Sequence, residues 1–334
     1  MFRNPRLLLL AFALVAVAVL VALLALTIGR LPVRPPLPNP NGYDDFVKAG
    51  EAVLGNVGDF PTLDQDSLAA LVSTNAEPLR LLRLGLTRKC VMPLDSALTN
   101  ASGMMNQLAR MKRLVQLLAA EGRLREMENQ PAAAARSYID AIRFGNEMRR
   151  SGFIITRLVG IACETIGYTP LAKLASKLTP DEARAVLTAL DKLDTGRVTW
   201  AEVQQGERRF MRYQIRKQVN PIMWVMGWWQ SRQAVQKSET KHKAVVARER
   251  LLAVELALRC YQSEQGHPPA RLDDLVTNYL SHVPQDPFSG QPLVYRAQGT
   301  NWLLYSVGPD GVDDGGKPVG RGLASKGDLS FDSP

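Results

Sequence analysis

Cysteine is scarce in this sequence and widely scattered. The three cysteines, Cys90, Cys163 and Cys260, are too few and too far apart for a disulfide framework or a metal-ligand cluster. A single bridge, for instance from Cys90 to Cys163, would suit an oxidising compartment. The spacing alone does not decide whether that bridge forms.

The familiar catalytic signatures are missing as well. The sequence contains no H-E-x-x-H, G-x-S-x-G, P-loop or Rossmann glycine pattern. Of its three histidines, His242, His267 and His282, we expect the last two at turns or on the surface, near prolines. No acidic residue looks isolated in an apolar setting that would shift its pKa. We therefore predict a protein that is not an enzyme, with an envelope hydrolase lacking a familiar motif as an alternative.

Concentrated basic tracts are also lacking, although the 334-residue chain carries a net charge of +9. Lysine and arginine are spread along most of the sequence, with no zinc-finger spacing and no RNP-like aromatic strand. This distribution argues against nucleic acid as a partner. It is more typical of an exported protein close to an anionic membrane surface.

One long apolar run is present near the amino terminus. Residues Leu7 to Ile28 contain no charged side chain, and 22 helical residues span about 33 Å, enough to cross a bilayer. No A-x-A cleavage site follows, so we predict an uncleaved transmembrane anchor (residues 1–29), with a cleaved signal peptide as the alternative. The membrane lipid would then be a partner through residues 7–28.

The flanks of this run suggest an orientation and a spacer. Arg3 and Arg6 precede it, and the free amino terminus tips the positive-inside balance towards an N-in, single-pass protein of the inner membrane. The bulk of the chain would then be periplasmic or otherwise extracytoplasmic. Residues 30–42 form the predicted linker, which is stiffened by five prolines between Leu31 and Pro40.

Residues 43–242 read as a helical body. Leu108, Met111, Val115 and Leu118 recur at three- and four-residue steps, which predicts one buried helix face. The run Thr179-Pro180-Asp181-Glu182 is typical of a helix start with a capping box.

One stretch of the body resembles a single tetratricopeptide hairpin. Arg125 stands where that repeat has an aromatic residue, and no second copy is found, so ordinary helix packing is the preferred interpretation. The pattern is carried by large, small and aromatic residues at the repeat's spacings: Leu118, Gly122, Ala134, Tyr138 and Ala141.

The segment 221–229 holds three of the five tryptophans and follows a basic stretch. A buried helix is the preferred interpretation. Contact with a membrane interface or with a protein partner remain alternatives.

The pattern changes again from residue 243. A helical stripe, Ala247, Leu251, Val254, Leu258 and Tyr261, is predicted to end near Gln265 and Gly266. A short helix is expected around residues 272–280. Two strands, 293–295 and 302–305, should then pair as a hairpin.

The order of elements between Lys243 and Phe331 resembles the C-terminal domain of the major pseudopilin of type II secretion. The matching residues are Tyr261, Gly266-His267-Pro268, Leu272, Leu275, Val283-Pro284, Asp286-Pro287-Phe288, Gly290, Tyr295 and Ser306-Val307-Gly308-Pro309-Asp310-Gly311. The resemblance implies a helix packed on a small antiparallel sheet in residues 243–334. It does not extend to the amino terminus, which lacks a prepilin peptidase site and the glutamate that follows it.

The same resemblance implies a bound calcium ion in the last loop. The matching positions are the Val307 carbonyl, Asp310 and Asp328, with Asp313 and Asp314 as further candidates. Calcium takes six to eight oxygen ligands, and this glycine-rich, acidic loop has little apolar surface to bury. Solvated turn aspartates are the alternative.

Together these observations predict an α+β protein with three parts: a transmembrane helix, a mostly helical exported body and a small pseudopilin-like module. We expect a structural or interaction role in an envelope assembly related to secretion, with a protein partner. The alternative is a helical scaffold that recruits a partner through its tetratricopeptide-like hairpin, with the C-terminal module as a cap.

Overall fold

Helices make up most of the computed structural model, which describes residues 36–93, 101–150, 154–206, 221–320 and 326–333. The α-helices are α2 (Gly42–Ala52), α3 (Gln65–Thr74), α4 (Ala76–Leu86), α6 (Ala101–Met127), α7 (Pro131–Arg149), α8 (Ile154–Leu174), α9 (Pro180–Thr195) and α11 (Pro221–Gln265). Three short 3-10 helices cover Val57–Thr62, Ala175–Lys177 and Leu272–Leu275. The strands are β1 (Val294–Gln298) and β2 (Asn301–Tyr305), so the chain is mostly helical with a small antiparallel sheet.

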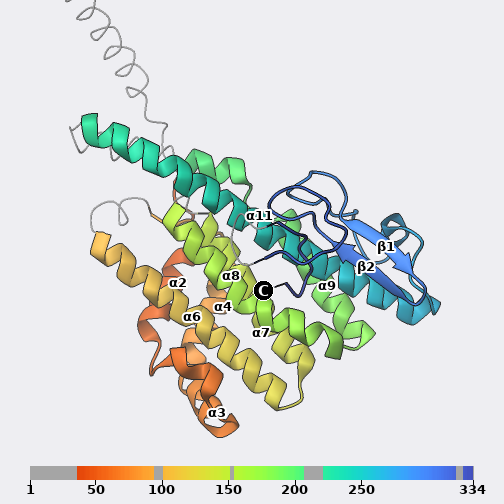
Figure 1. Cartoon of the computed structure of the whole chain (residues 1–334). Coiled ribbons are helices and arrows are strands. Elements are labelled where there is room, and N and C mark those ends of the chain that lie inside the picture. The colour runs from red at the N-terminus through yellow and green to blue at the C-terminus, as the bar shows by residue number, and fades with distance from the viewer. Residues whose placement is uncertain (1–35, 94–100, 151–153, 207–220, 321–325, 334) are drawn as a thin grey trace, which may run out of the picture.

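Helices α6, α7 and α8 lie side by side, and α11 runs past α8 and α9 towards the sheet (Figure 1). The predicted stripe of α6 is buried, with Leu108, Met111, Val115 and Leu118 at most 3% exposed. The capping box at Thr179 is also present, because its hydroxyl accepts from the Glu182 amide and the Glu182 carboxylate accepts in return. The local signals therefore predicted these helices correctly.

The α6–α7 hairpin depends on a close approach at Gly122. A Cβ atom there would lie 2.3 Å from the ring of Tyr138, so only glycine lets the two helices pack this closely. Tyr138 is 2% exposed, and its hydroxyl donates to Glu126 at 2.5 Å. The small and aromatic positions of the tetratricopeptide-like pattern thus meet at one helix contact.

The C-terminal module shares an apolar core with the body. Leu187 and Leu190 of α9 belong to the same buried cluster as Leu275, Leu293 and Leu304 beyond α11. Helix α11 also passes the expected boundary at residue 243 without a break, and ends at Gln265 before Gly266 in the left-handed conformation (φ 78°). The predicted end of this helix is confirmed.

One predicted element of the module differs. The helix expected around residues 272–280 is only a 3-10 turn, Leu272–Leu275. Thr277 has a φ of 80°, which no right-handed helix allows, and Val276 instead pairs with Leu280 in an isolated bridge. The hairpin is present, with Val294 opposite Tyr305 and Gln298 opposite Asn301.

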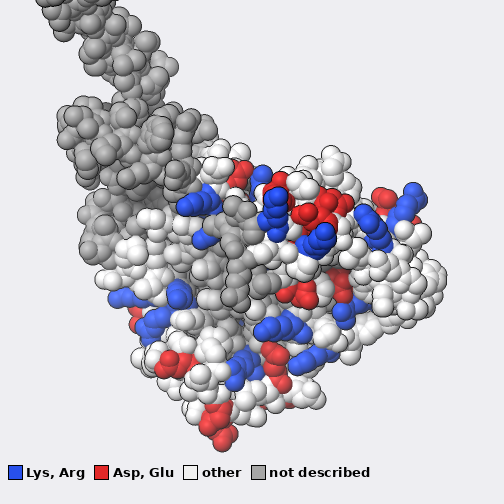
Figure 2. All heavy atoms as spheres, in the orientation of Figure 1, with Lys and Arg blue, Asp and Glu red and all other residues white. Residues whose placement is uncertain are grey.

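Several predictions concern residues whose structure is not described. The predicted anchor, residues 7–28, lies outside the described ranges, and within those ranges no helix is long and apolar enough to cross a membrane. Residues 221–229 form the first turns of α11, but their side chains are not described. The surface in Figure 2 shows basic and acidic residues interspersed over the described part of one face.

Candidate metal centre

A short bridge at the end of β2 brings the two ends of the acidic loop together. Ser306 and Leu329 exchange two main-chain hydrogen bonds of 2.9 Å, which places Val307 beside Asp328. The backbone is very close here, since a Cβ atom on Gly308 would lie 2.3 Å from the Gly327 carbonyl oxygen. Gly308 also has a φ of 71°, so this turn requires glycine.

Asp328 is the central carboxylate of the loop and is only 2% exposed. It accepts hydrogen bonds from the amides of Gly316 at 2.7 Å and Asp314 at 3.4 Å. Burial raises the pKa of Asp328, the two amides oppose that rise, and the nearby carboxylates of Asp313 and Asp314 add to it. The loop therefore gathers negative charge around a buried group.

The carboxylates of Asp314 and Asp313 differ in their hydrogen-bond partners. One carboxylate oxygen of Asp314, Oδ2, is buried and has no hydrogen-bond partner among the described residues. Asp313 is exposed and accepts from the Tyr305 hydroxyl at 2.6 Å and the Gly315 amide at 2.9 Å. The Tyr305 bond is the main reason why the pKa of Asp313 is lowered.

Asp310 behaves differently from the other candidates. It is exposed, and its carboxylate accepts from the Val312 amide at 3.2 Å within its own turn. The structure thus brings Val307, Asp314 and Asp328 together, with Asp313 close by. Asp310 forms its hydrogen bond within its own turn.

The donor set around Asp328 fits a hard cation. In the described part of the chain, no three His, Cys, Asp or Glu side chains form a metal-binding group. Calcium, however, also takes backbone carbonyl oxygens, so two carboxylates and turn carbonyls are a sufficient protein contribution. Oδ2 of Asp314, which has no partner among the described residues, and the buried carboxylate of Asp328 are two oxygen ligands of the kind that such an ion takes. Asp314, Asp328 and the Val307 carbonyl would hold the ion, which would neutralise the loop.

Asp286, which belongs to the pseudopilin-like motif, supports this turn in a way that the motif did not predict. Asp286 is completely buried and accepts from the Ser306 hydroxyl at 3.0 Å, the Val307 amide at 2.8 Å and the Phe288 amide at 2.9 Å. It ties the link before β1 to the residues that follow β2. The available signals were its place in the pseudopilin-like motif and in a turn-rich stretch before a proline.

A second feature overturns an expectation from the sequence. No acid was expected in an apolar setting, yet Glu164 is 0% and Glu249 4% exposed. Burial, helped by Glu164, raises the pKa of Glu249 to about 7, although the Arg197 guanidinium opposes the rise. Glu164 stands between apolar residues of α8, and this position was an available signal. The histidine expectation is confirmed, because His267 and His282 are exposed.

The three cysteines are free and buried. The Cys90–Cys163 bridge that the sequence left open is therefore not formed. Both thiols sit in the apolar core of the body, and burial raises their pKa values, so they are held as protonated apolar side chains.

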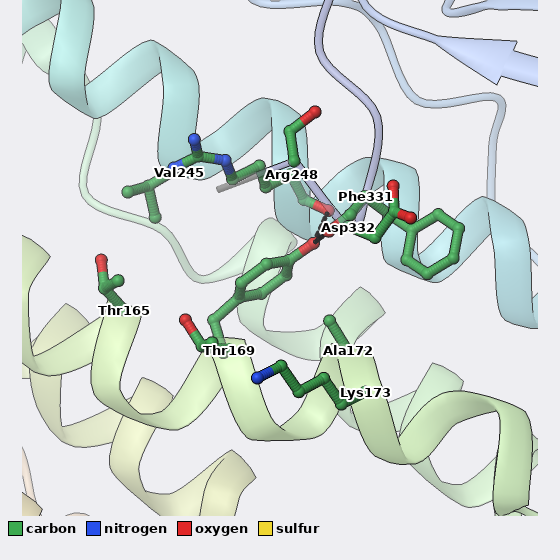
Figure 3. Close-up of a pocket in the computed structure, with 10 residues that line it drawn as sticks. Thr165, Thr169, Ala172, Lys173, Val245, Arg248, Phe331 and Asp332 are labelled. Atoms are coloured by element: carbon green, nitrogen blue, oxygen red, sulfur yellow. Dashed lines mark hydrogen bonds between the residues drawn. The ribbon is translucent and has the colours of Figure 1, made fainter. Parts of the chain in front are cut away.

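A pocket of about 330 Å³ lies between α8, α11 and the C-terminal tail. Thr169 and Lys173 line it from α8, Val245 and Arg248 from α11 (Figure 3). The hydroxyl of Tyr168 donates to the main-chain carbonyls of Arg248, at 3.0 Å, and of Phe331. These bonds tie the tail to the helices and do not form a nucleophile–base pair.

Comparison with protein-family models, with curated proteins and with solved structures gives no match to this chain. The resemblance to the pseudopilin C-terminal domain therefore stays a prediction.

Proposed function

We propose that this chain is a membrane-anchored structural or interaction protein of the cell envelope, whose C-terminal module is stabilised by calcium. The observation that supports it most directly is a buried oxygen of Asp314 that has no partner within the described ranges and lies beside the buried carboxylate of Asp328. Buried polar atoms nearly always have partners, and an ion is one of the ordinary explanations when none is seen.

The loop has little else to stabilise its fold. Val312 is exposed, and Gly311, Gly315 and Gly316 all have positive φ values, so the segment is rich in turns and poor in apolar contacts. Calcium would replace the repulsion between Asp314 and Asp328 with attraction. It would fix the loop against the bridge that follows β2.

The link to secretion rests on the resemblance and on the arrangement of the module. A long helix, α11, leads into a two-stranded hairpin, and Trp302 of β2 donates to Glu255 of α11 at 2.8 Å. A helix joined to a small antiparallel sheet is what the resemblance predicts. We infer that a module of this kind serves as a protein-binding element next to the membrane.

The calcium proposal is tested by thermal melting of the full chain in detergent, with added calcium and with a chelator. Calcium at a hundred times its dissociation constant should stabilise the chain by about 2.7 kcal/mol. In Asp314→Asn and Asp328→Asn this response should be lost. Asp273→Asn, an exposed change in the same module, is the control and should keep it.

The variants also separate a metal site from a loop that merely needs its hydrogen bonds. With chelator present, Asp314→Asn should be as stable as the parent or more so, because it removes a like charge next to the buried carboxylate of Asp328. A melting curve of the parent that chelator leaves unchanged would show that the loop holds no calcium.

The partner is tested by purifying the full chain from membranes and identifying the proteins that accompany it. Secretion components would support the envelope-assembly role. A single unrelated protein, lost when the α6–α7 hairpin is altered, would favour the helical scaffold instead.

A further inference from the structure

A cluster of buried charged residues lies in the helical body, away from the acidic loop. Arg149 of α7 and Arg157 of α8 are both 0% exposed, as is Glu164 of α8. His242 and Glu249 of α11 complete the cluster at 7% and 4% exposure. Full burial of two arginines is rare, because each guanidinium loses its hydration unless protein groups replace it.

Two arginines of this region, Arg149 and Arg197, form ion pairs with carboxylates. Arg149 donates to both carboxylate oxygens of Glu164, at 2.6 and 2.7 Å, and also contacts Nδ1 of His242. Arg197, whose side chain is 8% exposed, forms an ion pair with Glu249. Arg197 contacts only Oε2 of Glu249; Oε1 is also buried and has no hydrogen-bond partner among the described residues.

Arg157 is the third cation and has no such pair. None of its three guanidinium nitrogens has a hydrogen-bond partner among the described residues. Its guanidinium carbon lies 4.3 Å from the centroid of the Trp200 ring. This cation–π contact covers the flat face of the guanidinium but gives its N–H donors no acceptor. Burial, followed by the charge of Arg149, lowers the pKa of Arg157 to about 9, as expected for a cation without sufficient compensation.

Further buried donors point the same way. Nε1 of Trp200, Oγ of Ser238 and Nη1 of Arg197 are buried and lack a partner within the described ranges. Ser238 precedes His242 by one helical turn, and Trp200 stacks on His242 with ring centroids 6.1 Å apart, so these groups belong to the same cluster. With Asp194, which pairs with both Arg197 and Arg250, the region holds four arginines and three carboxylates, which leaves one positive charge in excess.

We propose that this cluster binds a phosphate-type oxyanion, with Arg157 as its principal ligand and Trp200 and Ser238 as additional donors. The N–H and O–H groups of Arg157, Trp200 and Ser238 are unpartnered among the described residues, and such donors suit a tetrahedral group with several acceptor oxygens. The shared chemistry is that of a free phosphate ion and of an anionic phospholipid headgroup. The proposal is independent of the calcium site, whose residues lie in another part of the fold.

The test uses the full chain in detergent and phosphate-free buffer. Its melting temperature is measured after adding inorganic phosphate, micelles of short-chain phosphatidylglycerol, or sodium chloride at matched ionic strength. Phosphate at a hundred times its dissociation constant should raise the midpoint by roughly 4 °C, and chloride should not. A response to phosphate identifies the free ion, and a response to micelles alone identifies a lipid headgroup.

Arg157→Met is the decisive variant, with Arg136→Met, an exposed arginine of α7, as the matched control. Without ligand, Arg157→Met should melt at or above the parent temperature, because a buried charge without a partner has been removed. It should lose the response to the ligand, whereas Arg136→Met keeps it. Ser238→Ala, which removes one donor only, should weaken the response several-fold in apparent affinity.

Two results would overturn the proposal. The first is a parent protein that responds to neither ligand, or to chloride as strongly as to phosphate. The second is an Arg157→Met protein that melts well below the parent in every buffer yet still responds to the ligand. That result would show that Arg157 is satisfied within the chain and does not contact the ion.

Discussion

His242 and Glu249 lie on the same helix and are both buried, yet burial lowers the pKa of one and raises the pKa of the other. Burial and the nearby charges of Arg149 and Arg157 lower the pKa of His242 far below its usual value of 6.5. Burial raises the pKa of Glu249 from 4.5 to about 7. Each group is therefore held in its neutral form more strongly than it would be in water.

The two shifts affect stability in opposite directions. Glu249 contributes stability that is fully present below about pH 4.5, the unfolded value, and is lost as pH rises through about 7. His242 contributes stability that is present above pH 6.5 and is lost as pH falls below that value. Between pH 4.5 and 6.5 the two contributions oppose one another.

We predict that replacing either residue leaves the other to set how the free energy of unfolding changes with pH. On acidification from pH 6.5 to 4.5, Glu249→Gln should lose stability more steeply than the parent, by up to about 1.4 kcal/mol per pH unit. His242→Gln should change the slope in the opposite sense. Urea unfolding in phosphate-free buffer measures both, and the exposed His282→Gln controls for losing a histidine. Parallel slopes in all four proteins would show that neither residue titrates as described.

At the scale of elements, the α6–α7 hairpin depends on a missing side chain. Gly122 allows the Tyr138 ring to lie directly against the backbone of α6. Serine, glutamate and arginine side chains reinforce the same hairpin, since Glu121 accepts from Ser137 at 2.7 Å and pairs with Arg83 of α4. The hairpin is therefore fixed by a steric contact and by polar contacts beside it.

We predict that Gly122→Ala destabilises the chain by about 1–3 kcal/mol, because the added methyl group overlaps the Tyr138 ring. In a Tyr138→Leu background the same change should cost less, since the ring is gone. Chemical unfolding of the four proteins in this double-mutant cycle measures the coupling. Strictly additive effects would mean that the glycine and the ring are not in contact.

The second element-scale contact is the clamp that Asp286 forms across the C-terminal module. Asp286→Ala leaves the Ser306 hydroxyl and the Val307 and Phe288 amides without their acceptor. We expect a loss of roughly 3 kcal/mol or more, because buried donors left unpaired are each costly. Hydrogen exchange should increase at the end of β2 while α6 and α7 stay protected. The exposed Asp273→Ala is the control, and equal losses in the two variants would refute the clamp.

At the scale of the whole molecule, the predicted anchor decides where the other contacts operate. The described residues begin at Pro36 and lead through a mostly exposed stretch to α2. The calcium site would work in an extracytoplasmic compartment, where calcium is abundant compared with the cytosol. The predicted anchor would also make a lipid headgroup available to the Arg157 cluster.

We predict that the full chain stays with membranes after an alkaline carbonate wash, and that a variant without residues 1–35 is released. Protease added to spheroplasts should digest the body of the full chain and spare a short N-terminal fragment. Release of the full chain by carbonate would contradict the anchor. Protection of the body from protease would contradict the N-in orientation.

The sequence alone determined those features that depend on neighbours a few residues away. The helix stripe of α6, the cap at Thr179, the end of α11 at Gly266 and the hairpin of β1 and β2 all follow from short-range spacing. Short-range patterns set hydrogen-bonded caps, turns and amphipathic faces, and these signals were strong here. The helix expected over residues 272–280 failed because the conformation of Thr277 carries no clear local signal.

Only the tertiary structure decided which charges are buried. Arg149 and His242 are 93 residues apart and meet because α7, α8 and α11 pack together. Whether a guanidinium or a carboxylate is desolvated depends on the helices and loops that pack over it. These come from distant parts of the chain, so a local sequence pattern does not predict them. The same holds for Asp286, whose partners lie both before β1 and after β2, and for Asp328, whose partners are amides 12 and 14 residues earlier in the acidic loop. The sequence supplied the charged residues, and packing over long separations made two of their clusters into candidate sites.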